Sequence, residues 1–119
     1  DGETRWAKYS HFSIASAEDN YRINITGYSG DAGDAMDDNN GAAFSTPERD
    51  NDAHTWLNCA SVWNGGGWWY ESCGAAQLNG EAHHGADTPS GEGIMWYQWH
   101  GSQYSLRGVT MMIRPATAE

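Results

Sequence analysis

The chain has 119 residues, a length typical of one domain. Its 6 Lys and Arg residues against 16 Asp and Glu residues give a formal net charge of −10. So few basic side chains cannot line a groove that follows phosphates, which excludes nucleic acid as a partner. No apolar stretch is long enough to span a bilayer. The chain begins at Asp1, without an initiator Met or a signal peptide, as expected of a mature form or a fragment.

The core is predicted to be aromatic. Leu, Ile, Val and Phe make up only 12 of the 119 residues, which at this net charge is typical of a disordered chain. The 7 Trp and 6 Tyr residues argue against disorder, because each such side chain can bury about 150–250 Å². An aromatic core in so small a domain needs support, so we expect a folded domain assisted by a disulfide bond or a metal ion.

Strands dominate the predicted secondary structure. The predicted strands cover residues 5–14, 21–28, 93–99 and 109–114, and short helical pieces are predicted at residues 15–20 and 74–78. In the second strand, Tyr21, Ile23 and Ile25 alternate with polar residues, the period of a half-buried strand. Residues 29–92 are rich in Gly, Asp and Asn, and so long a connecting region needs something that holds it in place.

Two features could hold this region, and the first is the pair Cys59 and Cys73. Their spacing does not match the short spacing of zinc or redox motifs. In an extracellular protein they would form a disulfide that stabilises the fold by about 3 kcal/mol. In the cytosol they would be two free thiols, and the residues alone leave both alternatives open.

The second feature is the acidic segment Glu-Arg-Asp-Asn-Asp at residues 48–52. Alternating acidic residues in a loop can direct oxygen atoms at one point, as calcium sites do. An EF-hand is excluded, because Ala53 and Cys59 stand where that motif needs Gly and Glu. The spacing alone favours a solvated acidic turn. The same interpretation applies to the more widely spaced Asp31, Asp34, Asp37 and Asp38.

The other chemical groups favour packing over catalysis. The glycine-rich segment 65–70 ends in Trp68, Trp69 and Tyr70, whose rings we expect in the core more than in sugar stacking. His83 and His84 point apart in an extended chain, so a metal shared between the two is not expected. A triad with Asp87 and Ser90 can be imagined, but no nucleophile motif surrounds it. We therefore expect no enzyme.

A series of short motifs also follows the order found in one known family: Tyr28-Ser29-Gly30, Ala32-Gly33-Asp34, Asn40-Gly41, Phe44-Ser45-Thr46, Arg49-Asp50-Asn51-Asp52, Asn58-Cys59-Ala60, Gly67-Trp68-Trp69-Tyr70, Cys73, Leu78-Asn79-Gly80, Gly93-Ile94, Trp96, Tyr104-Ser105-Leu106 and Met111 to Pro115. These motifs resemble the C-terminal half of the fibrinogen C-terminal domain, a family that includes fibrinogen chains, ficolins, tachylectins, angiopoietins and tenascins. The resemblance implies an α+β domain made mainly of antiparallel strands, with long ordered loops and few short helices. It also implies a secreted, extracellular protein and a disulfide between Cys59 and Cys73.

The same resemblance changes the interpretation of the acidic segment to a calcium site. It implies that Asp50 and Asp52 supply carboxylate ligands, and that backbone carbonyls near His54 and Trp56 complete the shell with waters. Oxygen donors of this kind suit Ca²⁺. The stretch between Asp52 and the first Cys is one residue longer than is usual in the family, so the second carbonyl belongs to Trp56 or to Leu57.

The family's domain is longer than this chain, and its N-terminal portion has no counterpart here. Residues 1–119 are therefore expected to form a single domain that is either truncated or naturally short. A sheet that has lost neighbouring strands exposes an edge, which another copy of the chain can pair with or cover. We accordingly expect a homo-oligomer.

For function, the resemblance to the family's lectins implies a calcium-dependent lectin that binds glycans, acetylated or acidic, in pathogen recognition by innate immunity. The pocket implied for the ligand consists of Trp63, Ser72, Cys73, Gly74, Ser90 and Gly91, with His84 at its rim. Gly74 and the pair Ser90-Gly91 replace larger residues of the ficolin pocket, which implies a wider, more polar pocket. The Ser72–Cys73 peptide is expected to be cis. The alternative is a structural or protein-binding module in adhesion, matrix or receptor binding.

Overall fold

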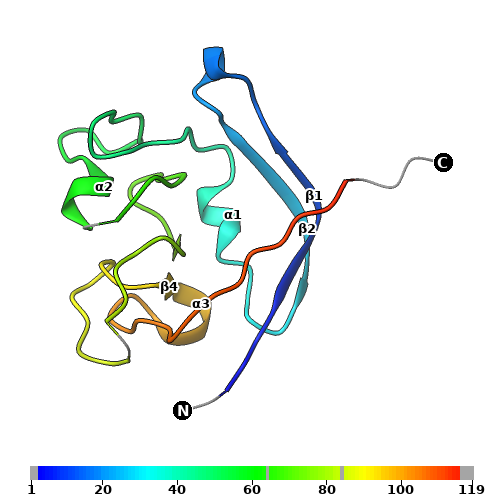
Figure 1. Cartoon of the computed structure of the whole chain (residues 1–119), viewed down its shortest axis with the longest axis vertical. Coiled ribbons are helices and arrows are strands. Elements are labelled where there is room, and N and C mark those ends of the chain that lie inside the picture. The colour runs from blue at the N-terminus through cyan, green and yellow to red at the C-terminus, as the bar shows by residue number, and fades with distance from the viewer. Residues whose placement is uncertain (1–2, 64, 84, 116–119) are drawn as a thin grey trace.

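The computed structural model describes residues 3–63, 65–83 and 85–115, and its longest element is a β-hairpin. Strand β1 (Ala7–Ile14) pairs with β2 (Ile23–Gly30) in antiparallel register, with Tyr9 opposite Tyr28. Figure 1 shows this hairpin along one side of the molecule and the shorter elements on the other. The 3-10 turn η1 (Ala17–Asp19) lies in the hairpin loop. The strands predicted over residues 5–14 and 21–28 are therefore present, although β2 begins at Ile23 and Tyr21 lies in the turn before it.

The rest of the chain folds into short elements joined by ordered loops. In chain order these are α1 (Met36–Asn39), α2 (Cys59–Val62), β3 (Ala76–Gln77), β4 (Met95–Trp96) and α3 (Tyr97–His100). Strands β3 and β4 pair in antiparallel fashion and form a second, two-stranded sheet. The fold is the expected one, mainly antiparallel strands with few short helices. Among the described residues, no helix is long and apolar enough to cross a membrane.

Aromatic rings fill the core between the hairpin and the short elements. Trp68, Trp69 and Tyr70 are buried. The ring of Trp69 meets the rings of Phe12 and Phe44 edge-on, at centroid distances of 6.4 and 5.3 Å. This geometry is favourable beyond the area that it buries. The indole N–H of Trp69 also donates to the Tyr21 carbonyl, which attaches the central segment to the hairpin loop.

One buried side chain, that of Asn39 at the end of α1, connects three segments of the central region. Its Nδ2 donates to the carbonyls of Trp69 and Ala76, at 2.9 and 3.4 Å. Its Oδ1 accepts from the backbone N–H groups of Ala75 and Ala76, at 3.3 and 3.2 Å. Gly74 lies so close to this amide that any side chain there would collide with it. Asn39 thus supplies hydrogen bonds that a neighbouring strand would otherwise make.

Three predicted elements differ from the structure. The helical piece expected at residues 74–78 is replaced by β3, because Gly74 has a positive φ of 134°, which a helix does not allow, and Ala76 and Gln77 pair with β4. The strand expected at residues 93–99 is shorter, since the chain turns into α3 directly after β4. The strand expected at residues 109–114 has no strand partner among the described residues, although Met111, Met112 and Ile113 are exposed there.

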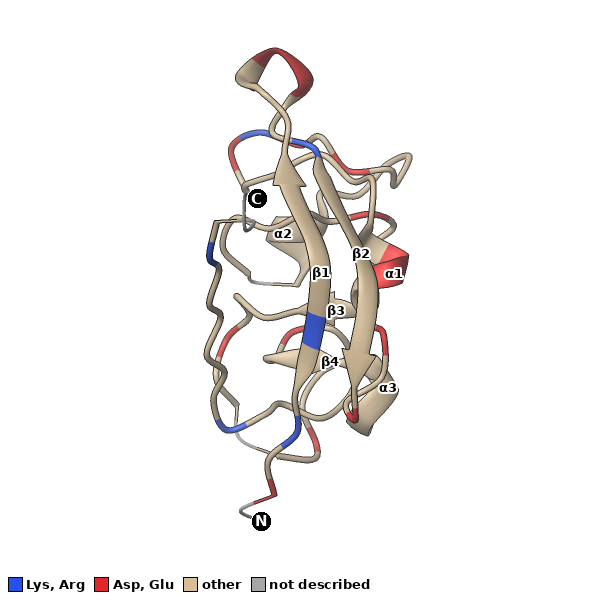
Figure 2. Ribbon diagram, turned by 90° about the vertical axis from the view of Figure 1, so that its right-hand side faces the viewer, with Lys and Arg blue, Asp and Glu red and all other residues tan. Residues whose placement is uncertain are grey.

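Charge is distributed unevenly over these elements. Figure 2 shows acidic residues at the hairpin loop and on α1, whereas β1 carries the basic Lys8 near its start. The acidic residues at these two places are Glu18, Asp19, Asp37 and Asp38. They lie on exposed turns, which agrees with the solvated loop expected for Asp37 and Asp38.

Candidate functional site

The acidic loop is attached to the core at its first residues. The buried Ser45 pairs with Trp68 in an isolated β-bridge, and its hydroxyl accepts from the backbone N–H of Asn51 at 2.9 Å. The Asn51 side chain donates to the carbonyl of Phe44 at 3.0 Å. Asn51, the residue between the two predicted carboxylate ligands, is therefore anchored to residues 44 and 45, while Asp50 is exposed and Asp52 is half-buried.

Asp50 and Asp52 lie close together and bind backbone N–H groups. An oxygen of Asp50 accepts from the N–H of Asp52 at 3.2 Å. Asp52 accepts from the N–H of His54 at 2.9 Å through Oδ1 and from the N–H of Cys59 at 2.8 Å through Oδ2. These bonds fold residues 50–59 into a closed loop around the Asp52 carboxylate.

The pKa of Asp52 is raised above its usual value. Partial burial is the main cause, and the nearby Asp50 carboxylate adds to it, while the hydrogen bonds from Cys59 and His54 act in the opposite direction. Two carboxylates held this close repel each other, and a cation between them removes that penalty. The electrostatics of the loop therefore favour a bound cation.

The backbone carbonyls expected to complete the calcium coordination shell have no hydrogen-bond donor among the described residues. Within the part of the chain that the structure describes, the carbonyl oxygens of His54 and Trp56 accept no hydrogen bond. The His54 imidazole instead faces the loop, and its Nδ1 accepts from the N–H groups of Trp56 and Leu57 at 3.4 and 3.3 Å. Two carboxylates and free carbonyls form a donor set of oxygens only, which fits Ca²⁺.

A disulfide holds the far end of this loop. Cys59 and Cys73 are bonded to each other, and the Ser72–Cys73 peptide is cis. The N–H of Ala53 donates to the carbonyl of Glu71 at 2.9 Å. The acidic loop is thus fixed to the segment around Cys73 both through a covalent bond and through the backbone.

The residues predicted to line a ligand pocket are partly brought together. The Trp63 ring lies against Gly91, where any side chain would collide with it, and meets the Tyr70 ring at 6.3 Å. Gly74 faces the Asn39 amide in the same close manner. Ser72 and Ser90 are exposed, and Ser90 donates to the Ser102 hydroxyl at 3.0 Å. His84 lies outside the described residues.

Other side chains of the protein fill the space beside Gly74 and Gly91. Trp63 occupies the volume beside Gly91, and Asn39 occupies the volume beside Gly74. Two surface cavities lie elsewhere. One, of about 370 Å³, is near the hairpin loop, and the other, of about 400 Å³, lies between residues 3–5 and residues 99–108.

Exposed apolar side chains that the sequence patterns did not indicate lie in the acidic loop and at the end of α2. We call Trp56, Leu57 and Val62 the loop apolar surface, and the Trp56 side chain is 86% exposed. Trp residues of this kind dominate the energy of many protein interfaces. The signal in the sequence is the pair Trp56-Leu57 inside a polar loop.

Residues 1–116 match the family described as the C-terminal globular domain of fibrinogen beta and gamma chains. The chain therefore belongs to this family, as the motifs implied. It is a family of globular fibrinogen domains.

Named relatives place the chain within the family. It is 42% identical over 118 residues to mouse angiopoietin-2, covering 98% of this chain and 23% of that protein. The fibrinogen-like globe domain of human ANGPTL6 matches with a TM-score of 0.79 and 41% identity, over 87% of this chain and 46% of that one. A lamprey fibrin D-dimer complexed with a Gly-His-Arg-Pro-amide peptide ligand matches with a TM-score of 0.78 and 37% identity, over 87% and 38%. The chain thus spans less than half the length of each.

These relatives correct the expected function. A calcium-dependent lectin of innate immunity was implied by the resemblance to ficolins and tachylectins. The relatives found are instead angiopoietin-type proteins, a fibrinogen-like globe domain and a fibrin fragment that holds a peptide. The lectin interpretation is therefore wrong, and the alternative of a protein-binding module agrees better with these relatives.

Proposed function

We propose that the chain is a non-enzymatic, protein-binding module of a secreted protein, and that the loop apolar surface contacts the partner. The observation that carries this proposal is the exposure of Trp56, 86%, on a loop whose backbone is fixed at both ends. A rigid aromatic side chain loses little conformational freedom on binding, which makes it an effective anchor. The peptide held by the lamprey fibrin relative supports a protein or peptide ligand.

Calcium is part of this proposal. Asp50, Asp52 and the carbonyls of His54 and Trp56 would hold the ion, as the donor set described above allows. When bound, Ca²⁺ supplies positive charge that offsets the two carboxylates. Because Trp56 would contribute only its backbone carbonyl, its side chain remains available to a partner.

The loop apolar surface suits a partner with an apolar patch and few negative charges. Leu57, next to Trp56 in sequence, and Val62, the last residue of α2, add further apolar area, each 43% exposed. The chain as a whole carries a formal charge of −10, which disfavours approach by an acidic partner and favours a basic one. We therefore infer a neutral or basic extracellular protein surface as the binding partner.

Binding to an array of extracellular receptor ectodomains, measured in Ca²⁺, tests this proposal. We expect at least one ectodomain to bind the wild type and to lose more than about tenfold in affinity for Trp56→Ala. Trp6→Ala is the matched control, because Trp6 is also exposed but precedes β1. Binding that Trp56→Ala leaves unchanged, or no binding to any ectodomain, would contradict the proposal. Unaltered calcium-dependent melting of Trp56→Ala shows that the loop is intact.

A further inference from the structure

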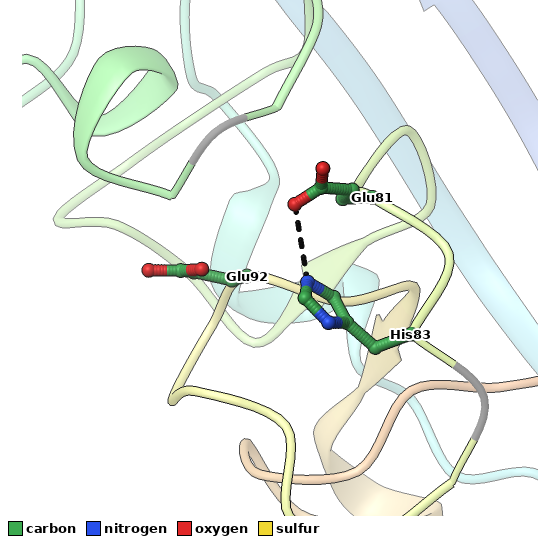
Figure 3. A group of neighbouring side chains, drawn as sticks. All are labelled: Glu81, His83 and Glu92. Atoms are coloured by element: carbon green, nitrogen blue, oxygen red, sulfur yellow. Dashed lines mark hydrogen bonds and ion pairs between the residues drawn. The ribbon is translucent and has the colours of Figure 1, made fainter.

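A second group of metal-binding side chains lies away from the acidic loop. Glu81, His83 and Glu92 each offer one ligand atom, and these atoms all lie within 4.8 Å of one another. Figure 3 shows Glu81 directed at the His83 ring, with the Glu92 carboxylate to one side of that ring. In the described ranges it is the one group of three or more His, Cys, Asp and Glu side chains with this proximity.

Hydrogen bonds fix the backbone that carries the three side chains. The N–H of Glu81 donates to the carbonyl of Glu92 at 3.1 Å. The buried Ser105 hydroxyl accepts from the N–H of His83 at 3.2 Å and from the N–H of Ile94 at 3.0 Å. The two segments that contribute ligands are therefore held in one arrangement before any ion binds, which lowers the cost of forming a site.

The negative charges of Glu81 and Glu92 are not balanced within the group that they form with His83. Nε2 of His83 lies 3.1 Å from Oε1 of Glu81, and this contact is an ion pair when the imidazole is protonated. Glu92 adds a second carboxylate close to the same imidazole. A single exposed ion pair contributes little to stability, so stability alone does not account for the cluster. A divalent cation would balance both carboxylates while the imidazole remains neutral.

We propose that Glu81, His83 and Glu92 form a Zn²⁺ site with one coordination position open to solvent. One imidazole nitrogen and two carboxylate oxygens are ligands that Zn²⁺ accepts at about 2.0–2.2 Å. Tetrahedral geometry then sets the ligand atoms about 3.4 Å apart. The contact between His83 and Glu81 is already close to this separation. The side chain of Glu92 is half-buried, and its ligand atom lies within 4.8 Å of those of Glu81 and His83.

The donor set separates this site from the acidic loop. Ca²⁺ prefers oxygen ligands throughout, as Asp50 and Asp52 offer, whereas an imidazole nitrogen favours Zn²⁺. The proposal therefore does not depend on the calcium site or on the protein-binding function. Each can fail while the other holds.

Zn²⁺ affinity, measured by competition with a chromophoric chelator in excess Ca²⁺, tests the site. We expect the wild type to bind one Zn²⁺ per chain, and both His83→Ala and Glu92→Gln to lower the affinity by more than about tenfold. Glu92→Gln is informative because it leaves the contact between Glu81 and His83 in place. His11→Ala is the matched control, since His11 is exposed on β1 and lies outside the group.

A second measurement keeps the test independent of folding. X-ray absorption at the zinc edge of the loaded wild type should show nitrogen and oxygen ligands that include one imidazole, with loss of the imidazole signal in His83→Ala. The melting temperature of each variant, measured without added metal, verifies that the fold is intact. The proposal is overturned if the wild type does not bind Zn²⁺, or if His83→Ala and Glu92→Gln bind it as tightly as His11→Ala does.

Discussion

The Asp52 carboxylate closes its loop on Cys59, whose backbone N–H donates to Oδ2 at 2.8 Å. Cys59 is in turn bonded to Cys73, so one carboxylate connects the acidic loop to the disulfide. A change in the charge of Asp52 is therefore transmitted to the segment that starts α2 (Cys59–Val62). In the loop apolar surface, Trp56 and Leu57 lie between Asp52 and Cys59 and Val62 ends α2, so the position of this surface depends on the contact between Asp52 and Cys59.

Calcium should raise the melting temperature through Asp52. A ligand that binds only the folded state at a hundredfold excess over its Kd adds about 2.7 kcal/mol to the free energy of unfolding. We expect Asp52→Asn to abolish this increase, because one carboxylate is lost from the donor set. Asp38→Asn, on α1 (Met36–Asn39), should retain it. Equal melting of the wild type in EDTA and in excess Ca²⁺ would contradict the site.

Tyr70 should make the fold sensitive to alkaline pH. Burial raises the pKa of Tyr70 to about 12, from 10.0, while its hydroxyl donates to the carbonyl of Gly66 at 2.9 Å. A group whose pKa is higher in the folded state stabilises the fold fully below its unfolded pKa, and this contribution is lost as the pH rises from about 10 to about 12. We expect a loss of about 2–3 kcal/mol over that range. Denaturant unfolding at several pH values, compared with Tyr70→Phe, measures it, and equal pH slopes in the two proteins would exclude this origin.

Gln77→Met should stabilise the protein. The Gln77 side chain is buried beside the Tyr70 hydroxyl, and within the described residues neither its nitrogen nor its oxygen makes a hydrogen bond of good geometry. An unpaired buried amide costs about 1–3 kcal/mol, and Met fills a similar volume without that cost. We expect the free energy of unfolding to rise by about 1 kcal/mol in urea titrations. Gln103→Met, at an exposed position, serves as the control and should change stability little. A less stable Gln77→Met would show that the amide is satisfied in solution.

The segment at residues 107–115 should mediate self-association. Within the described part of the chain its backbone forms no hydrogen bonds, and Met112 is 86% exposed. An extended segment with free N–H and C=O groups and apolar side chains can pair with another copy. We expect sedimentation velocity to show a dimer that Met112→Lys weakens by more than about tenfold, whereas Tyr97→Lys, at an exposed residue of α3 (Tyr97–His100), does not. A wild type that stays monomeric at high concentration would exclude this association.

Local sequence patterns predicted the structural features that depend on residues close together in the chain. The alternation of Tyr21, Ile23 and Ile25 predicted a strand that the structure confirms as β2 (Ile23–Gly30), and the aromatic composition predicted the aromatic core. The short elements were harder to predict, because distant groups determine them. Residues 74–78 have a helical composition, yet Ala76 pairs with β4 and bonds to Asn39, and both partners are distant in sequence.

The two candidate metal sites differ in the same way, because the residues of one are neighbours in sequence and those of the other come from two segments. The spacing of Asp50 and Asp52 lies within one loop, so a motif could point to it. Glu81, His83 and Glu92 meet only because the Ser105 hydroxyl and one backbone bond hold two segments together. Adjacent His83 and His84 suggested no shared metal, and the structure pairs His83 with two carboxylates from its own and a later segment instead.

The Asn39 amide also bears on how this chain can vary over evolution. Its four hydrogen bonds fix the backbone at Trp69, Ala75 and Ala76, whatever the length of the connection from residue 40 to residue 68. Lengthening a flexible connection changes its closure entropy only slowly with length. Insertions at the exposed residues 55–57 of that stretch can therefore alter the surface offered to partners, whereas Ala42, Ala43, Cys59 and Ala60 belong to the buried core. Asn39 itself, together with the Gly74 that leaves room for it, is the part of the chain least free to change.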